Sequence, residues 1–236
     1  MTLGELRSAL RFLTRLPLPA AEPRSFGAAA FPLVGLLLGA MLLAVDAVPL
    51  AARLRDVAIL AASAIATGAI HYDGLADTLD ALGGSTRAER LRIMRDGSIG
   101  VFAALGLIVI AALELAALGE LAGRARTVAL LAAPVLGRWA MVLSGFRATS
   151  AREEGLGASF AREVDGRQMA VATLTALGVA VILAGGRGMI VCSIVATSAA
   201  AVRGFARSRF GGVTGDVLGG AGLLGETLAL VLFAAT

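Results

Sequence analysis

Long apolar blocks separated by short polar segments are the dominant pattern along this chain. A helix needs about 20 mostly apolar residues to cross the hydrocarbon core of a bilayer, where no water can satisfy an unpaired backbone. The blocks therefore predict an all-α polytopic membrane protein, with about seven transmembrane helices in one bundle and a single domain over residues 1–236. The predicted spans are 27–51, 56–73, 99–119, 127–146, 168–186, 189–206 and 217–235.

Composition agrees with this pattern. Hydrophobic residues make up 58% of the chain and charged residues 16%, and the mean hydropathy is +0.85. A soluble domain is about half apolar and a quarter charged. The net charge of +4 could suggest a nucleic-acid partner, but nearly all of the basic residues, every one an arginine, lie in short segments between apolar blocks. We therefore expect the lipid bilayer, and no nucleic acid, as the partner of these arginines.

The arginines alternate in number from one inter-span segment to the next. Counted by alternate sides, one side holds 15 arginines and the other holds 5, with Arg138 inside a span. Arginine excess marks the cytoplasmic side of a membrane protein. The counts predict a cytoplasmic N-terminus and an outer C-terminus, with the polar segments 84–98, 147–167 and 211–216 all facing the cytoplasm.

The N-terminal segment has a helical pattern of its own. Leucines recur at helical spacing from Leu3 to Leu13, and arginines form an i, i+4, i+8 row from Arg7 to Arg15. This pattern predicts an amphipathic helix within residues 1–18 that lies at the lipid surface. A plain topology signal is the alternative interpretation.

The stretch "IHYDGLADTLD" ends an apolar block with three carboxylates, Asp73, Asp77 and Asp80. Spacings of i, i+4 and i+7 put the three within about 60° of arc on one helix face. Acids at a membrane boundary are costly, and like charges on one face repel, so a cation should lie beside them. His71, the only histidine, points almost to the opposite side. It is typical of a capping or packing residue, with a substrate contact as the alternative.

A divalent cation is the partner that we favour for these three acids. Mg²⁺ prefers carboxylate oxygen, and it usually bridges one or two acids to substrate phosphates. The alternative is that the acids pair with arginines of the 84–98 segment and hold no metal.

The stretch "RAERLRIMRDGSIG" follows the acids and carries Arg90, Arg95 and Asp96. Arginines suit phosphate oxygens as partners. A solvated loop that obeys the positive-inside rule would explain any one of these arginines as well.

The stretch "GGVTGDVLGG" at 211–220 lies directly before the last span. Its glycines allow a tight turn whose amides can contact a phosphate, and Asp216 could complete a metal site. Glu114 and Glu226 lie inside predicted spans, which makes each a functional candidate without an evident partner.

Together these stretches resemble the cobalamin synthase family, also called adenosylcobinamide-GDP ribazoletransferase or cobalamin 5′-phosphate synthase. Five motifs occur in the order of the family, over the length of the chain. They are "FLTRLPLP" (12–19), "FPLVG" (31–35), "HYDGLADTLDALGG" (71–84), "RLRIMRDGSIGVF" (90–102) and "GGVTGDVLGG" (211–220).

The resemblance implies a Mg²⁺-dependent transferase of the bacterial cytoplasmic (inner) membrane. Its substrates would be adenosylcobinamide-GDP and α-ribazole or α-ribazole 5′-phosphate. GMP would leave, and adenosylcobalamin or its 5′-phosphate would form. On this basis the expected metal ligands are Asp73, Asp77 and Asp80. The expected catalytic residues are Asp216, Arg90, Arg95 and Asp96, and the expected substrate contacts are His71, Gly74, Thr214 and Gly215.

Two other interpretations are open at this point. A CDP-alcohol phosphotransferase also uses aspartates beside an Asp-Gly pair, but Ala76 and Asp77 stand where its pattern does not allow them. A membrane transporter would use acids inside the spans, yet no paired broken-helix repeat is evident. Release of GMP, compared with substrate flux in sealed vesicles, distinguishes the enzyme from the transporter.

Overall fold

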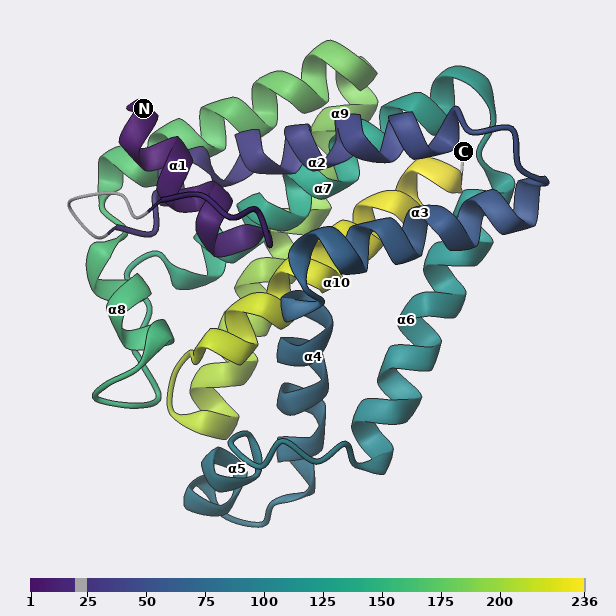
Figure 1. The fold of residues 1–236 in the computed structure, drawn as a ribbon. Coiled ribbons are helices and arrows are strands. Elements are labelled where there is room, and N and C mark those ends of the chain that lie inside the picture. The colour runs from purple at the N-terminus through teal and green to yellow at the C-terminus, as the bar shows by residue number, and fades with distance from the viewer. Residues whose placement is uncertain (20–24, 236) are drawn as a thin grey trace.

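The computed structural model describes residues 1–19 and 25–235 and contains no strand among them; Arg24, which was counted among the N-terminal arginines, lies outside this range. The all-α prediction is confirmed (Figure 1). The α-helices are α1 (Leu3–Leu13), α2 (Phe31–Asp46), α3 (Ala52–Thr67), α4 (Ile70–Asp80), α5 (Arg87–Ile93), α6 (Val101–Glu120), α7 (Gly123–Gly145), α8 (Leu156–Glu163), α9 (Gly166–Phe210) and α10 (Gly215–Ala234). Two short 3₁₀ turns, η1 (Ala28–Ala30) and η2 (Ala81–Gly83), adjoin α2 and α4.

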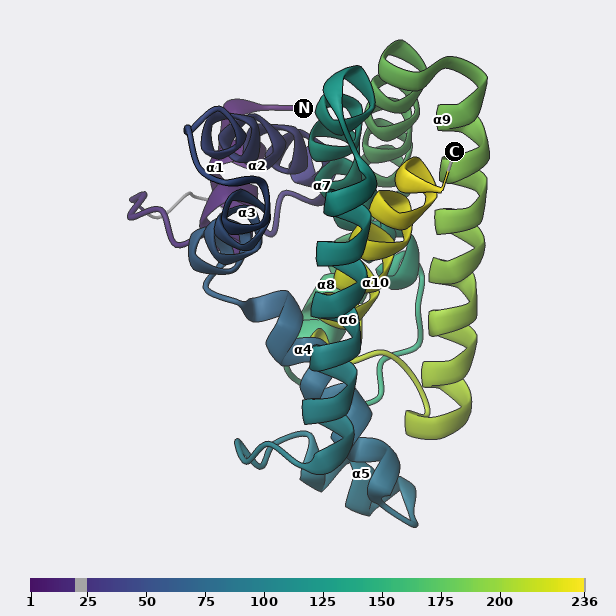
Figure 2. The ribbon, with the colours of Figure 1, turned by 90° about the vertical axis from the view of Figure 1, so that its right-hand side faces the viewer.

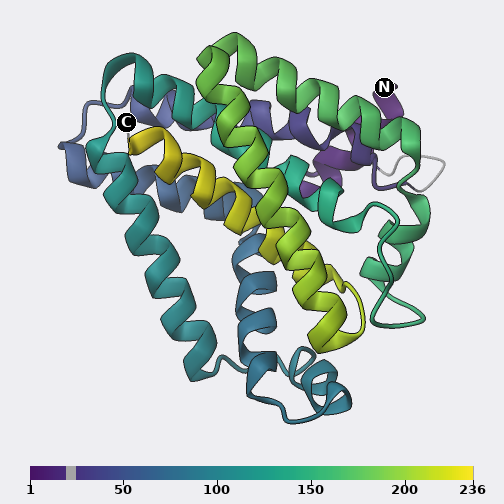
Figure 3. The ribbon, with the colours of Figure 1, turned by 180° about the vertical axis from the view of Figure 1, so that it is seen from behind.

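Five helical segments are long and apolar enough to cross a membrane, and a bent pair, α3 with α4, would make a sixth crossing. A polytopic membrane protein is therefore confirmed, while the number of about seven crossings stays a prediction. Two of the predicted spans, 168–186 and 189–206, lie in the single long helix α9. It turns back on itself at Gly185, which is non-helical with φ 57° (Figure 3). Gly188 then packs so closely on the backbone of Ala180 that no β-carbon would fit.

The predicted span 56–73 was wrong as a single straight helix. The chain breaks at Gly68 and Ala69, which both take left-handed backbone angles with φ 64° and φ 56°. The helices on the two sides of this break meet at 88°. The carboxylates therefore lie on a separate short helix, α4, and not on the continuation of α3 (Figure 1).

Helix α7 is the core of the bundle and packs against α2, α9 and α10. In its most apolar stretch 83% of the residues are buried, against 28% in α6, whose Leu105 and Ile108 are exposed. Glycines bring the helices together: Gly35 on α2 packs directly on the backbone of Pro134, and Gly39 does the same at Leu130. Small residues at such crossings are the usual means of helix packing in lipid.

The helix predicted within residues 1–18 is present as α1. Thr2 caps it, and its side-chain oxygen accepts from the amide of Glu5 at 3.2 Å. Ala9 and Leu13 are fully buried, whereas Leu3 is 86% exposed. The apolar face thus packs largely on the protein, and its position at a lipid surface stays a prediction.

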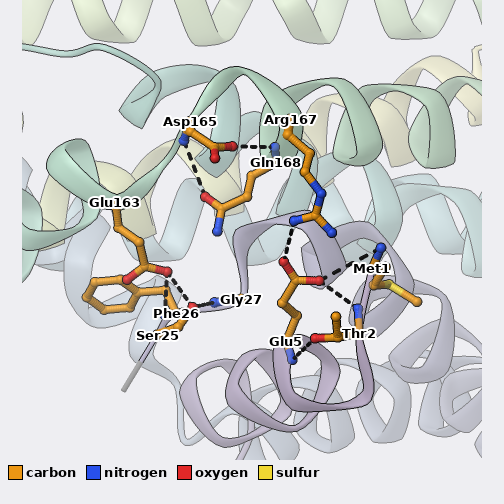
Figure 4. A network of polar contacts seen from close by, with 10 residues as sticks. All are labelled: Met1, Thr2, Glu5, Ser25, Phe26, Gly27, Glu163, Asp165, Arg167 and Gln168. Atoms are coloured by element: carbon orange, nitrogen blue, oxygen red, sulfur yellow. Dashed lines mark hydrogen bonds and ion pairs between the residues drawn. The ribbon is translucent and has the colours of Figure 1, made fainter. Parts of the chain in front are cut away.

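Charged contacts join α1 to the start of α9, as Figure 4 shows. Arg167 donates to Glu5 at 2.9 Å, and this bond lowers the pKa of Glu5 below its ordinary value. Glu163, at the end of α8, accepts from the hydroxyl of Ser25 at 2.6 Å and from the amide of Phe26 at 2.8 Å. The N-terminal region therefore lies on the same side of the molecule as the 147–167 segment.

The polar segments between helices gather at one end of the molecule (Figures 1 and 2). Arg87 on α5 donates to the carbonyl of Phe210 at 2.8 Å and to that of Ala151 at 2.9 Å. Ser150 and Val213 form an isolated parallel bridge between the α7–α8 and α9–α10 connections. The structure thus brings together segments that the arginine counts placed on one side. That this side is cytoplasmic stays a prediction.

Candidate active site

The site begins where α4 crosses the start of α10. Gly74 faces the backbone of Asp216, and a β-carbon on Gly74 would lie 2.6 Å from that carbonyl oxygen. Gly219 likewise lies close to the backbone of Ile70, and Gly220 lies close to the backbone of Leu75. The structure therefore places Gly74 inside a helix contact, where it allows the two acid-bearing helices to approach, and away from the cavity wall.

The start of α10 is fixed by Thr214. Its hydroxyl oxygen accepts from the amide of Val217 at 3.2 Å, which caps the helix, and its hydroxyl lies 3.2 Å from Oδ2 of Asp216. Thr214 is only 3% exposed, and Gly215 is the first residue of the helix. A threonine at this position commonly stabilises a helix start. Here the same hydroxyl also orients the carboxylate of Asp216.

A cavity of about 280 Å³ lies between the start of α4 and the start of α10. Five of the predicted site residues line it: His71, Asp73, Thr214, Gly215 and Asp216. The others, which are Gly74, Asp77, Asp80, Arg90, Arg95 and Asp96, do not line it. Phe12 of α1, Met141 of α7 and residues of the 150–158 segment complete the wall, so five distant parts of the sequence meet there.

Asp77 lies close enough to Asp73, Asp80 and Asp216 to interact electrostatically with each of them. Yet among residues 1–19 and 25–235 no three histidine, cysteine or acidic side chains converge on a point where one ion could bind. The three-carboxylate site predicted from α4 alone is therefore not formed as a closed cluster.

Asp80 has a different partner. Its Oδ2 accepts from the amide of Gly100 at 2.6 Å, and its Oδ1 accepts from the amide of Ala103 at 2.8 Å. These amides begin α6, so Asp80 caps that helix from a neighbouring one. Both oxygens of Asp80 are thus engaged in holding α6 against the end of α4.

The arginines of the α5 region divide into anchored and free ones. Arg90 donates to the carbonyls of Gly84 at 2.9 Å and Arg209 at 3.3 Å, which ties α5 to the end of α9. Arg95 and Asp96 are exposed in the turn that follows α5. Of the three predicted here, Arg90 is therefore held as a structural anchor, while Arg95 and Asp96 stand at the surface.

Sequence reasoning missed Arg152, which lines the cavity. It donates to the carbonyl of Leu91 at 3.1 Å and interacts electrostatically with Asp77 and Asp216. Burial, and then the charge of Arg95, lower the pKa of Arg152. As an arginine it still carries a positive charge. Nothing in "ATSAREEGLG" separated Arg152 from an ordinary cytoplasmic arginine, because only the fold brings it to the acids.

The carboxylates at this site fit a Mg²⁺ ion that also binds the substrate. Hard cations prefer carboxylate oxygens, and Mg²⁺ commonly uses one or two protein acids together with substrate phosphates and waters. Asp73, Asp77 and Asp216 are mutually close, with Arg152 as the cation beside them. The acids outnumber that cation, so a site of two carboxylates completed by a phosphorylated substrate is compatible with the geometry.

Comparison with known proteins identifies the family of this chain. Residues 5–234 match the model of the cobalamin-5-phosphate synthase family. The chain belongs to this family. A protein of Roseiflexus sp. (strain RS-1) called adenosylcobinamide-GDP ribazoletransferase is 37% identical over 94% of this chain and 86% of its own length. Proteins of the same name from Escherichia coli O139:H28 and Shigella boydii serotype 18 are each 39% identical, over 94% of this chain and 96% of theirs. No solved structure matches the chain.

Family membership decides against the CDP-alcohol phosphotransferase and the transporter interpretations. The contacts of the acids inside the spans are consistent with this. Glu114 accepts from the hydroxyl of Tyr72 at 2.9 Å and from that of Thr227 at 2.6 Å. Glu226 forms an ion pair with Arg138, which is only 2% exposed. Neither glutamate lines the cavity. Both therefore have structural partners inside the bundle of this family member.

Proposed function

We propose that this chain catalyses the reaction for which its relatives are named. The adenosylcobinamide-phosphate part of adenosylcobinamide-GDP passes to α-ribazole or its 5′-phosphate, and GMP leaves. The observation that carries the proposal is the family match over residues 5–234. The cavity, with Asp73 and Asp216 on its wall, supplies a place for the chemistry.

The reaction exchanges one bond to phosphorus for another. An oxygen of a ribose hydroxyl bonds to the phosphorus nearer the cobinamide, and the bond from that phosphorus to the bridging oxygen of GMP breaks. The phosphorylated product keeps its 5′-phosphate, so the attacking hydroxyl is another one on the ribose. Such displacements need an in-line approach and neutralised phosphate charge more than covalent help from the protein.

Asp216 is suited to accept the proton of the attacking hydroxyl. Its carboxylate lines the cavity, and the hydroxyl of Thr214 holds one oxygen in place. A general base needs to lie within hydrogen-bond reach of the proton that it takes. The cavity wall offers this position to a substrate hydroxyl inside the cavity.

Asp73 and Asp77 are the residues that would hold Mg²⁺, either together or each with Asp216. Bound there, Mg²⁺ would neutralise charge on the diphosphate and so favour its cleavage. Arg152, which lies near Asp77 and Asp216, would contact the same phosphates, because guanidinium groups pair well with phosphate oxygens. Arg95, whose charge is felt at Arg152, would add to the positive field there.

The site would face the cytoplasm of a bacterial inner membrane. The bacterial relatives and the apolar helices support a location in the inner membrane. The excess of arginines on the side of the site supports its orientation toward the cytoplasm. In this position the site can receive soluble nucleosides directly from the cytoplasm.

The test is a two-substrate assay on purified full-length protein in lipid nanodiscs. We expect GMP and a cobalamin product to form in equal amounts from adenosylcobinamide-GDP and α-ribazole 5′-phosphate. The reaction should stop with EDTA and recover when Mg²⁺ is added in excess. Absence of both products in the presence of Mg²⁺ would refute the proposal. Substrate flux in sealed vesicles without GMP release would indicate a transporter instead.

A further inference from the structure

A different cavity, which we call the arginine cavity, lies away from the acids of α4 and α10. It has a volume of about 520 Å³ and is formed by the start of α7, the turn of α9 and the end of α10. Figures 2 and 3 show these three parts at the other end of the molecule from α5 and the α9–α10 connection. Two arginines, Arg124 and Arg187, line the arginine cavity, and its other lining residues are uncharged. Among the residues that the structure describes, it therefore holds two cations and no acid.

These two arginines differ from a close neighbour in having no acidic partner. No ion pair between residues that the structure describes includes Arg124 or Arg187. Arg126, only two residues further along α7, pairs with Asp46 and Asp56, so these acids are already engaged. Guanidinium groups pair readily with phosphate and carboxylate oxygens, and two of them beside one cavity therefore suit an anionic ligand.

Arg187 is held in place by the end of α10. Its Nη2 donates to the carbonyl of Leu232 at 3.1 Å and to that of Phe233 at 2.6 Å. The guanidinium also lies 5.6 Å from the centre of the Phe233 ring. Its Nε and Nη1 donate to no residue that the structure describes. The group is therefore oriented before a ligand binds, which lowers the entropy cost of binding, and it retains donors for that ligand.

Apolar side chains of the same cavity are exposed. Val181 is 42% exposed and Ile182 is 81% exposed, and both line the arginine cavity within the predicted span 168–186. Exposed apolar side chains in a membrane-spanning helix contact the hydrocarbon of the bilayer. A free inorganic anion would gain nothing from such contacts, whereas an anionic phospholipid joins a charged headgroup to apolar chains.

We propose that the arginine cavity binds an anionic phospholipid. The phosphate of the headgroup pairs with Arg124 and Arg187, and an acyl chain lies along Val181 and Ile182 of α9. The lipid supplies the negative charge that the described side chains of this cavity lack. This inference does not depend on the reaction that the chain catalyses.

Photo-crosslinking of the full-length protein in phosphatidylcholine nanodiscs tests this assignment. A small share of phosphatidylglycerol with a diazirine on its acyl chain is added, and peptide mass spectrometry locates the crosslinked residues. We expect labelling within residues 181–187. A phosphatidylcholine with the same diazirine should label them at least about fivefold less, because one arginine near anionic lipid contributes about that factor in binding. Arg124→Glu places an acid in the cavity with the remaining cation and should lower labelling by phosphatidylglycerol about tenfold or more.

Arg53→Glu is the matched control. It reverses an exposed arginine that lines a different cavity, together with Arg126, and it should leave the labelling unchanged. The thermal midpoint, followed by light scattering, checks the folding of each variant. If Arg124→Glu does not fold, Arg187→Gln decides the question and should lower labelling about fivefold.

Equal labelling by the two lipids, or unchanged labelling in a folded variant, would overturn the assignment. So would loss of labelling in excess inorganic phosphate but not in sodium chloride of equal ionic strength, because that result would indicate a site for a free anion. The labelling needs no turnover, so a protein that releases no GMP would refute the proposed function and leave this test unaffected.

Discussion

Two groups of charged side chains in this molecule differ in how they are compensated. Inside the bundle and at the end opposite the cavity, the buried and half-buried acids have partners. Arg126 donates to Asp46 at 2.8 Å and to Asp56 at 2.6 Å, and Arg138 pairs with Glu226. At the cavity, Asp73, Asp77 and Asp216 form no ion pair with any residue that the structure describes, although Arg152 lies near two of them.

The difference separates structural charge from functional charge. A buried charge without a partner is expensive, so acids that serve only the fold are found with a cation or a hydrogen-bond donor. Groups left uncompensated in a cavity are candidates for ligand binding. The comparison predicts that changes in the two regions have different results: loss of turnover at the cavity, and loss of stability in the bundle.

The largest effect on turnover is expected from Asp77→Asn. This change keeps the shape of the side chain but removes its charge. A Mg²⁺ ion beside the transferred phosphate would then lose one of its carboxylate ligands. GMP release should fall about 10³-fold or more at saturating Mg²⁺. The thermal midpoint should stay within a few degrees of the wild-type value, because Asp77 has no ion-pair partner among the described residues to lose.

Glu120→Gln is the matched control for Asp77→Asn. It neutralises an exposed acid at the far end of α6 and should not change turnover. If Asp77→Asn kept wild-type activity, the uncompensated acids would not be the metal site, and the contrast between the two regions would fail.

The largest effect on stability is expected from Arg138→Met. It leaves Glu226, whose side chain is only 15% exposed, without its cation, and loss of one partner of a buried pair typically costs about 3–5 kcal/mol. The double variant Arg138→Met, Glu226→Met replaces the pair by apolar side chains and should recover most of this loss. Denaturation of the two variants in detergent, compared with Glu226→Met alone, gives the coupling energy. Single and double variants of equal stability would show that the pair does not act as a unit.

Arg152→Gln should lower turnover by about 10²-fold, because a cation next to the transferred phosphate is lost. Arg152→Lys keeps the charge but not the planar fork of donors, and it should recover only part of the activity. Arg162→Gln, in nearby α8, is the control: its side chain is exposed, and among the residues that the structure describes it donates only to the carbonyl of Glu153. Equal activity of all three variants would remove Arg152 from the site.

Much of this arrangement is visible in the sequence, because it depends on local periodicity. Apolar blocks indicated the helices, and the i, i+4, i+7 acids indicated one polar face beside the membrane. The break at Gly68 and Ala69 was not visible, since a glycine–alanine pair in an apolar run is also typical of a continuous helix. That break points α4 away from α3 and so determines which other segments meet its acids.

The partners of single side chains were also out of reach of the sequence. Arg152 and Asp216 are far apart in the chain, and contacts such as the bridge between Ser150 and Val213 bring their segments together. Asp80 has the spacing of a metal ligand, but its oxygens are engaged by amides of α6. Spacing shows which side chains share a face, and it cannot show which of them a neighbouring helix will occupy.

Asp80 and Asp77 both lie on α4, so their substitution compares a charge that serves the fold with one that serves ligand binding. Asparagine keeps one of the two oxygens that accept from α6 and loses the other acceptor. Because these amides, and not a metal, engage Asp80, Asp80→Asn should lower turnover no more than a few-fold, far less than Asp77→Asn. Asp80→Ala should cost about 1 kcal/mol of stability through loss of the cap. If Asp80→Asn instead matched Asp77→Asn in activity, Asp80 would belong with the metal ligands.

The smallest effect is expected at the ion pair between Glu5 and Arg167, which is compensated but lies at the surface. Arg167 is 55% exposed, and exposed pairs contribute little. Because Arg167 lowers the pKa of Glu5 in the folded chain, the ionised carboxylate stabilises the fold above its ordinary pKa of 4.5. This contribution is lost as the pH falls through the folded value. The thermal midpoint of Glu5→Gln should lie at most about 2 °C below that of the wild type at neutral pH and should equal it near pH 3. A difference of the same size at both values of pH would show that the carboxylate acts by packing or capping, and that charge compensation has no role at this edge of the molecule.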